Sequence, residues 1–484
     1  MKRIITIVAL LFPLVASFAQ GTDDACLFSQ TYYQGTAKAL GMGNALGAVG
    51  GDMTAVCINP AGLGLYRSNE LTTTLSLLDN FGTSNYYGSN ALANKFRITL
   101  PNIGYASVKQ RSNYRKLRFT QFGIGLTRTN EFNTHTLAKG INPTSSKIDN
   151  YLAQIDGYSP LDIQNVFPYT IYPAWSTYLI NISQDSIGDY YDSPVPQGGI
   201  WQGQENTFKG RAEEWTFAGS ANYADRLFIG ISAGLNHVKR VGTRVFQEWM
   251  PEQIDTISFK QWNFTESLSS TGWGGNLKVG LIYHASNWLR IGAAFHSPTV
   301  FSFDETWQTE TESEINSIKN KYISHESHYE YTFIKPLKWV GSMAFVIGQE
   351  ALVSIDAEYM NYGAARFRAD DWDYSGTNSD IEATFGRTLN FRLGSEWRLN
   401  NTYLRFGAAY YGSPYGIGKA DGSVKKASMG FCLPVSENTT FDFAYELSYS
   451  KNRFSLYDAG DLGIEPVRQR QFRNILAFTL KFRY

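Results

Sequence analysis

Apolar and polar side chains alternate along most of this chain, and the last nine residues show the alternation most clearly. From Leu476 to Tyr484 every even position is bulky and apolar, whereas the odd positions are small, polar or cationic. Because successive side chains of a strand point to opposite faces, this segment has one apolar face and one wet face. The same pattern returns at 289–296, 353–359, 389–398 and 441–449. The pattern predicts a chain of amphipathic strands.

Fourteen strands are expected after residue 69, and the segments between them are short and long in turn. The predicted strands lie near 70–78, 97–109, 116–129, 211–223, 226–243, 270–284, 287–303, 337–348, 351–362, 388–399, 402–412, 424–434, 440–450 and 471–484. The short turns are 109–116, 224–225, 285–286, 348–350, 400–401 and 434–439. The long loops are 79–96, 130–210, 244–269, 304–336, 363–387, 413–423 and 451–470.

Short turns at one end and long loops at the other are typical of a transmembrane barrel whose long loops lie outside the cell. We therefore predict an all-β fold, an antiparallel barrel of about fourteen strands formed by residues 69–484. In its last strand the even residues would face lipid, and Lys481 and Arg483 would face the lumen beside a plug.

The insert at 130–210 is too long for a structureless loop. Apolar residues in it have helical spacing, first at Ile148, Tyr151, Leu152 and Ile155, then from Ile171 to Leu179. We expect a partly helical extracellular loop. Its aromatic residues would either gather a hydrophobic ligand or simply pack the loop on itself: Phe167, Tyr169, Tyr172, Trp175 and Tyr178.

Composition agrees with a barrel in a membrane. Aromatic residues make up 15% of the chain, yet its mean hydropathy is −0.27. A barrel conceals its hydrophobicity in alternation, so an averaged hydropathy stays low. No segment after the amino terminus offers about twenty consecutive apolar residues. Lysine plus arginine equals aspartate plus glutamate, at 43 each, so no overall basic field would attract nucleic acid.

The amino terminus predicts export. Lys2 and Arg3 precede an apolar run at 4–18, and small residues lead to a cleavage site after Ala19. These features are typical of a secretory signal peptide, which we assign to residues 1–19. Together with the strand pattern, they place the protein in the outer membrane of a Gram-negative bacterium.

Few side chains suggest a disulfide, a metal site or a catalytic site. Cys26 and Cys57 have the option of a disulfide after export, whereas Cys432 would stay unpaired. His325 and His328 flank Glu326 without the spacing of a zinc-protease motif, and we expect a solvated loop there. No arrangement of nucleophile, base and acid can be placed from spacing. We predict no enzyme, no cofactor and no metal.

Residues 20–68 break the alternation and are rich in glycine and alanine. They are too few for a domain with its own core. They are enough to fold back as a plug, or hatch, and a fourteen-stranded lumen is too wide for side chains alone to fill. The glycines in this segment would allow close packing against the barrel wall.

The plug segment closely resembles that of the FadL-type outer-membrane transport family. The resemblance is carried by Gly41, Gly43, Asp52 and the turn Asn59-Pro60-Ala61-Gly62, and it continues at 273–280, 295–298, 335–337, 356–359 and 390–397. It is to Bacteroidetes-like members of the family. Cys57 and the long 130–210 insert depart from the pattern.

This resemblance implies a channel for passive uptake of hydrophobic compounds such as long-chain fatty acids. The ligand would be caught by outer loops, enter the lumen and leave sideways into the bilayer near the hatch. The hatch or gating residues would be Gly41, Gly43, Asp52, Asn59, Pro60, Ala61 and Gly62. A protein-secretion or surface-assembly barrel and a haemin receptor remain alternatives.

The expected partners are a hydrophobic small molecule, outer-membrane lipid and the barrel-assembly machinery, with the protein itself a monomer. Phe482 and Tyr484 would present the assembly signal at the carboxyl terminus.

Overall fold

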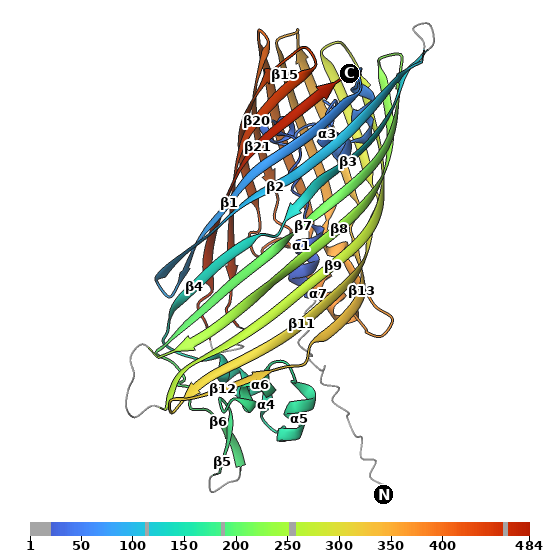
Figure 1. Ribbon diagram of the computed structural model, residues 1–484. Coiled ribbons are helices and arrows are strands. Elements are labelled where there is room, and N and C mark those ends of the chain that lie inside the picture. Colours follow the sequence, from blue (N-terminus) through green and yellow to red (C-terminus); the bar gives the residue numbers. More distant parts are fainter. Residues whose placement is uncertain (1–20, 112–115, 185–188, 251–257, 458–462) are drawn as a thin grey trace, which may run out of the picture.

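The computed structural model describes residues 21–111, 116–184, 189–250, 258–457 and 463–484, and the predicted signal peptide lies outside them. It is a closed antiparallel β-barrel of fourteen wall strands (Figure 1), which confirms the predicted fold class. The first strand pairs with the last, from Glu70 opposite Arg483 to Asn85 opposite Arg468.

Four of the fourteen wall strands are interrupted and carry two labels each. In order round the barrel the strands are β1 (Glu70–Tyr86), β2 (Ser89–Gln110), β3 (Leu117–Glu131) with β4 (Thr134–Asn142), β7 (Ile200–Tyr223), β8 (Leu227–Trp249), β9 (Phe259–His284), β10 (Leu289–His296) with β11 (Thr299–Ile315), β13 (Ser327–Lys335) with β14 (Lys338–Ile347), β15 (Ala351–Asn361) with β16 (Arg366–Arg368), β17 (Arg387–Leu399), β18 (Thr402–Tyr411), β19 (Val424–Pro434), β20 (Thr439–Phe454) and β21 (Val467–Arg483).

Five of the six predicted short turns are confirmed, and the sixth, 109–116, includes residues 112–115, which lie outside the described residues. Several predicted loops are wrong. Residues 79–96 form a hairpin of β1 and β2, joined only by Tyr87 and Gly88. The 130–210 insert is likewise shorter than predicted, because its ends are strands β4 and β7. These strands project past the membrane, where water wets both faces, so the alternation that reveals a strand fades there.

The outer wall carries an apolar band. Along β9 the exposed side chains from the short-turn end are Tyr283, Leu281, Val279, Leu277 and Trp273. At about 3.3 Å per residue and a tilt near 40°, this row rises about 25 Å, the height of a hydrocarbon core. Near the end of β21, Leu480 and Phe482 are exposed and Lys481 is buried, as predicted. Arg483, also predicted to face the lumen, is 51% exposed at the end of the strand, where it pairs with Glu70 at 2.9 Å.

No helix among the described residues has the length and apolarity needed to cross a membrane.

A cap of helices covers the long-loop end (Figure 1). It consists of α4 (Lys147–Ile155), α5 (Pro160–Val166), α6 (Ile171–Ser176) and a small sheet of β5 (Asn181–Gln184) and β6 (Asp189–Asp192). The helical spacing predicted at Ile148, Tyr151 and Ile155 is confirmed, because all three are buried in α4. Smaller elements of the other loops are β12 (Ile318–Ile323), α7 (Ser375–Thr384) and the 3-10 turn η2 (Tyr362–Ala364).

The plug occupies the lumen, as the blue segments inside the barrel show (Figure 1). It is formed by α1 (Thr22–Ser29), α2 (Ala37–Gly41), α3 (Met53–Ile58) and the 3-10 helix η1 (Pro60–Leu65). Almost every residue from Tyr33 to Gly64 is buried. The plug therefore fills the lumen nearer the short turns, and α1 extends further towards the long-loop end, where Asp24 pairs with Arg240 of β8 at 2.9 Å (Figure 1).

Candidate functional site: a lumen cavity beside a break in the barrel wall

Backbone pairing between the second and third wall strands stops partway along the barrel. β2 pairs with β3 only from Asn102 to Gln110, and the described pairings of its remaining residues are to β1 alone. Pro101 stands where the pairing ends, and proline has no N–H to donate. The register with β1 shifts opposite this point, between Thr74 and Ser76. The sequence therefore ends the ladder inside the membrane band.

The third strand bends at the same place. Its register with β7 shifts between Arg128 and Asn130, pairing continues as far as Glu131 opposite Arg211, and β4 then pairs with β7 from Thr134 opposite Phe208. The plug takes the position that β2 has left: Tyr32 and Gln34 donate their backbone N–H groups to the carbonyls of Thr129 and Arg128, at 2.7 and 2.9 Å. Within a membrane every backbone polar group needs a partner. Here the backbone of the plug supplies two of these partners.

Side chains cross the break instead of a ladder. The Arg97 guanidinium donates to Asn133 Oδ1 at 2.6 Å, and Lys95 Nζ donates to the Phe208 carbonyl at 2.8 Å. From the lumen side, Asn80 Nδ2 donates to the Asn133 carbonyl at 2.6 Å. Side-chain hydrogen bonds therefore join the strands on the two sides of the break.

A cavity of about 270 Å³ opens on the lumen side of the break. Plug, strand ends and bent third strand all contribute to its lining. Its apolar part is formed by Leu27, Phe81, Phe132, Phe208 and Phe472, and its polar part includes Asn80, Glu131, His135, Arg240, Lys426, Gln471 and Arg473. A second cavity of about 400 Å³ shares Leu27, Phe208 and Arg240 with the first and extends past α1 to Trp307.

The cations that line the cavity of about 270 Å³ are held in different ways. Arg240 pairs with Asp24 of α1 at 2.9 Å, and its guanidinium carbon lies 4.1 Å from the centre of the Phe208 ring. Burial raises the pKa of the Asp24 carboxyl, and the positive charge of Arg240 opposes that shift. In contrast, the described hydrogen bonds of Arg473 go only to the uncharged Asn80 side chain and to a backbone carbonyl.

The predicted hatch residues lie together in the plug. Asp52 accepts from Thr54 N at 2.9 Å and pairs with Lys481 Nζ at 3.2 Å, which joins the plug to the last wall strand. Asn59 caps η1 by accepting from Ala61 N at 3.1 Å, and its Nδ2 donates to Leu281 O of the wall at the same distance. These contacts anchor the plug. Gating remains a prediction.

Glycine allows the close approach that was expected. A Cβ added to Gly41 would lie 3.2 Å from the Cα of Gly430 on β19. Gly43 has φ near +59°, and a Cβ there would lie 2.9 Å from a wall amide. Gly62 packs on Gly50 within the plug, while Pro60 meets Gly230 of β8.

The predicted ligand-gathering aromatics lie in the cap rather than at the described cavities. Their ring partners are other loop or rim aromatics: Phe167 with Tyr158, Tyr169 with Trp307, Tyr172 with Tyr322, and Trp175 with Tyr191. Tyr178 is 60% exposed. The structure thus brings these residues together as packing of the cap, and a role in binding stays a prediction.

The sequence analysis missed the residues of the break itself. Pro101 carried a usable signal, because a proline inside an alternating strand marks an edge or an irregularity. Phe208, Asn133 and Arg473 carried none that distinguishes them from other strand residues.

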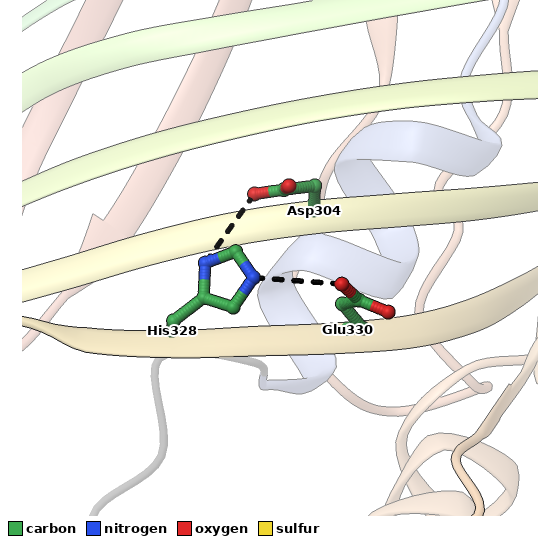
Figure 2. A group of neighbouring side chains, drawn as sticks. All are labelled: Asp304, His328 and Glu330. Atoms are coloured by element: carbon green, nitrogen blue, oxygen red, sulfur yellow. Dashed lines mark ion pairs between the residues drawn. The ribbon is translucent and has the colours of Figure 1, made fainter.

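The structure also tests the possible disulfide and the histidine-containing segment at 325–328. All three cysteines are free. His325 and Glu326 lie exposed in a loop, as expected. His328 instead lies in β13, with its ring 3.7 Å from Asp304 and 3.6 Å from Glu330 (Figure 2). These three side chains are exposed and face outwards.

Comparison with known proteins finds likeness in structure only. No protein-family model matches the chain, and no curated protein matches it. A FadL homologue of Pseudomonas aeruginosa is similar over 94% of this chain and 99% of its own, with a TM-score of 0.60 and 10% identity. The Pseudomonas putida toluene transporter TodX, at 12% identity, and the Ralstonia pickettii toluene transporter TbuX, at 14%, cover the same shares with TM-scores of 0.54 and 0.52. The chain has the fold of the FadL-type outer-membrane channels.

Proposed function

We propose that this protein is an outer-membrane channel for passive uptake of hydrophobic compounds, with amphipathic acids such as long-chain fatty acids as its preferred class. The short turns would face the periplasm and the cap would face the medium. A compound would pass the cap, occupy the cavity beside Phe208 and leave sideways through the break into the bilayer. The observation that carries the proposal is the interrupted ladder between β2 and β3 next to that cavity.

The energetics favour such a route without a coupled energy source. Each methylene that moves from water into the membrane gains about 0.8 kcal/mol, so a long acyl chain is driven inwards once it has passed the polar surface layer. A lateral exit keeps the chain out of water throughout. The plug, anchored by Asp52 and Asn59, meanwhile blocks the straight route to the periplasm.

The cavity lining favours an acid over a plain hydrocarbon. Aromatic rings supply the apolar surface, while Arg473 and Lys426 project cationic groups into the same space. Lys426 already pairs with Glu446 at 2.8 Å, whereas Arg473 meets uncharged acceptors. Arg473 is therefore the side chain with a charge to offer to a carboxylate.

Uptake assays with matched substrates test the proposal. Cells lacking the gene, complemented with wild type or variants, would be given palmitate, hexadecanol or toluene. We expect the protein to raise uptake of palmitate most. Phe208→Ala should lower uptake of both long-chain compounds about tenfold, because a wall of the cavity is lost. Arg473→Gln should lower palmitate uptake severalfold and leave hexadecanol unchanged.

Met429→Leu, on the lipid-facing surface, is the matched control and should behave as wild type. Equal uptake of all three compounds with and without the protein would overturn the proposed function. Dependence on the protein for toluene alone would overturn the assignment of substrate class.

A further inference from the structure

A row of cations stands on the outer wall beside the break. Lys209 and Arg211 lie on β7, two residues apart and on one face, and Lys239 of β8 is the direct ladder partner of Arg211. All three are exposed. Like charges directly opposite each other on a sheet destabilise it unless something neutralises them. We call these three residues the basic patch.

The basic patch follows the apolar band directly on the long-loop side. On β7 the exposed apolar residues end at Trp215, and Arg211 is the second outward position beyond it. On β8 the apolar band reaches Leu235, Lys239 is likewise the second outward position beyond it, and a single exposed apolar residue, Val241, follows Lys239. The strands thus pass from hydrocarbon to cation within about two outward residues. The headgroups of the outer leaflet lie at this boundary.

The protein supplies too little negative charge to neutralise this region. Arg211 pairs with Glu213 at 2.8 Å, but that carboxylate is shared with Arg128. Lys209 and Lys239 have no ion pair to any described residue. Lys95 and Arg97 of the break add to the excess, because their described hydrogen bonds go to uncharged acceptors such as the Phe208 carbonyl and the Asn133 side chain.

Further round the barrel, past β9, the outer wall has the opposite sign. Thr271 of β9 has two ladder partners, Lys239 of β8 on one side and Asp304 of β11 on the other. Asp304 in turn pairs with Glu330 of β13, and Figure 2 shows these two carboxylates. These carboxylates are 62% and 81% exposed. The excess of cations is therefore a local feature of β7 and β8. It is not a property of the whole rim.

We propose that the basic patch binds the phosphate groups of a phosphorylated glycolipid of the outer leaflet. Phosphate oxygens accept charge-assisted hydrogen bonds from arginine and lysine, and several cations at a membrane surface together hold an anionic lipid. The acyl chains of the bound lipid would lie on Trp215, Phe217 and Leu235 below the patch. A lipid held there would border the break, but the site is separate from the lumen cavity and from its substrate.

Binding of bisphosphorylated lipid A to the purified full-length protein tests this inference. The protein in detergent with excess EDTA, which removes bridging metal ions, is titrated with the lipid and the dissociation constant is measured. We expect the triple variant Lys209→Gln, Arg211→Gln, Lys239→Gln to bind at least about tenfold more weakly, because each surface cation adds to the attraction. Dephosphorylated lipid A should bind the wild-type protein as weakly as the phosphorylated lipid binds the triple variant.

Two control variants fix the interpretation. Asp304→Asn with Glu330→Gln changes charges on the neighbouring wall and should leave binding unchanged, as should Lys209→Arg with Lys239→Arg. If the triple variant does not fold, Lys209→Gln and Lys239→Gln singly serve instead, since neither breaks an ion pair. Equal affinity of wild type and the charge-removing variants would overturn the inference. So would competition by inorganic phosphate as effective as by the lipid.

Discussion

Two stretches of the barrel wall satisfy their backbone hydrogen bonds in different ways. From β7 to β9 the ladders are unbroken: β7 pairs with β8 from Trp201 to Tyr223 without a register shift, and β8 pairs with β9 as far as Trp249. Between β2 and the third strand, pairing ends at Asn102, and plug backbone and side chains take over. Both stretches leave the membrane-embedded backbone largely satisfied.

The difference lies in what it costs to open each stretch. An unbroken ladder opens only if many buried backbone bonds are lost together, and each unsatisfied group in lipid costs several kcal/mol. The break is crossed by a few side-chain bonds worth about 1 kcal/mol each, somewhat more where a charge takes part. A barrel that needs a side exit can therefore have one only where the sequence has already ended the ladder.

Locking the break should have the largest effect on uptake. In the variant Asn94→Cys with His135→Cys, a short thiol crosslinker would join β2 to β4, since the His135 ring lies 3.3 Å from the Asn94 carbonyl. We expect uptake of palmitate to fall more than tenfold and to return when the link is cleaved. The assay is transport in cells before and after crosslinking.

The matched control places the link across the unbroken wall. Thr243→Cys with Ser267→Cys joins direct partners of β8 and β9, and its crosslinking should leave uptake unchanged. Equal losses for both pairs would mean that the break is not the exit.

Loosening the break should have a moderate effect of opposite sign. Asn133→Ala removes the acceptor of Arg97, a charge-assisted bond of about 1.5–3 kcal/mol. We expect uptake to rise two- to fivefold and the amount of folded barrel to stay the same, as measured by transport and by heat-modifiable electrophoresis. Slower uptake with unchanged folding would show that Asn133 guides the substrate and does not hold the break closed.

The smallest effect on uptake should come from the cap, which rests on the unbroken wall. Lys147 of α4 lies over Phe246 and Phe264 of β8 and β9, and burial lowers its pKa from 10.5 to about 8. At a pH between these two values, Lys147 is protonated when the cap is undocked and deprotonated when the cap is docked. Docking should therefore strengthen as the pH rises from about 8 towards 10.5 and stay constant below pH 8.

Hydrogen exchange of α4 measures this dependence. After correction for intrinsic exchange, protection should increase between pH 8 and 9.5 in wild type and remain flat in Lys147→Met, while uptake changes less than twofold. Protection that falls over this range in wild type would contradict the assigned direction of the pKa shift.

Much of the architecture was readable from the residues. Alternation gave the strand number, the five short turns that lie wholly in described residues and the lipid-facing side of the last strand, and the Asn59-Pro60 turn marked the plug. The hairpin at 79–96 was mistaken for a loop because its tip residues, such as Asn85 and Asn90, are polar on both faces. The candidate site was mostly invisible, since its lining residues are spaced along the chain from Leu27 to Arg473.

By itself the sequence determined the wall, because a repeat of two residues fixes which side chains meet lipid and which meet the lumen. It also determined where the plug touches that wall closely, because only glycine fits positions such as Gly43. The tertiary structure alone decided where the wall is interrupted and what lies beside the interruption. Strands pair through contacts between residues that are distant in the sequence, so a missing pairing partner leaves no local sequence pattern. Here the single exception is the proline at position 101, next to the end of the β2–β3 pairing.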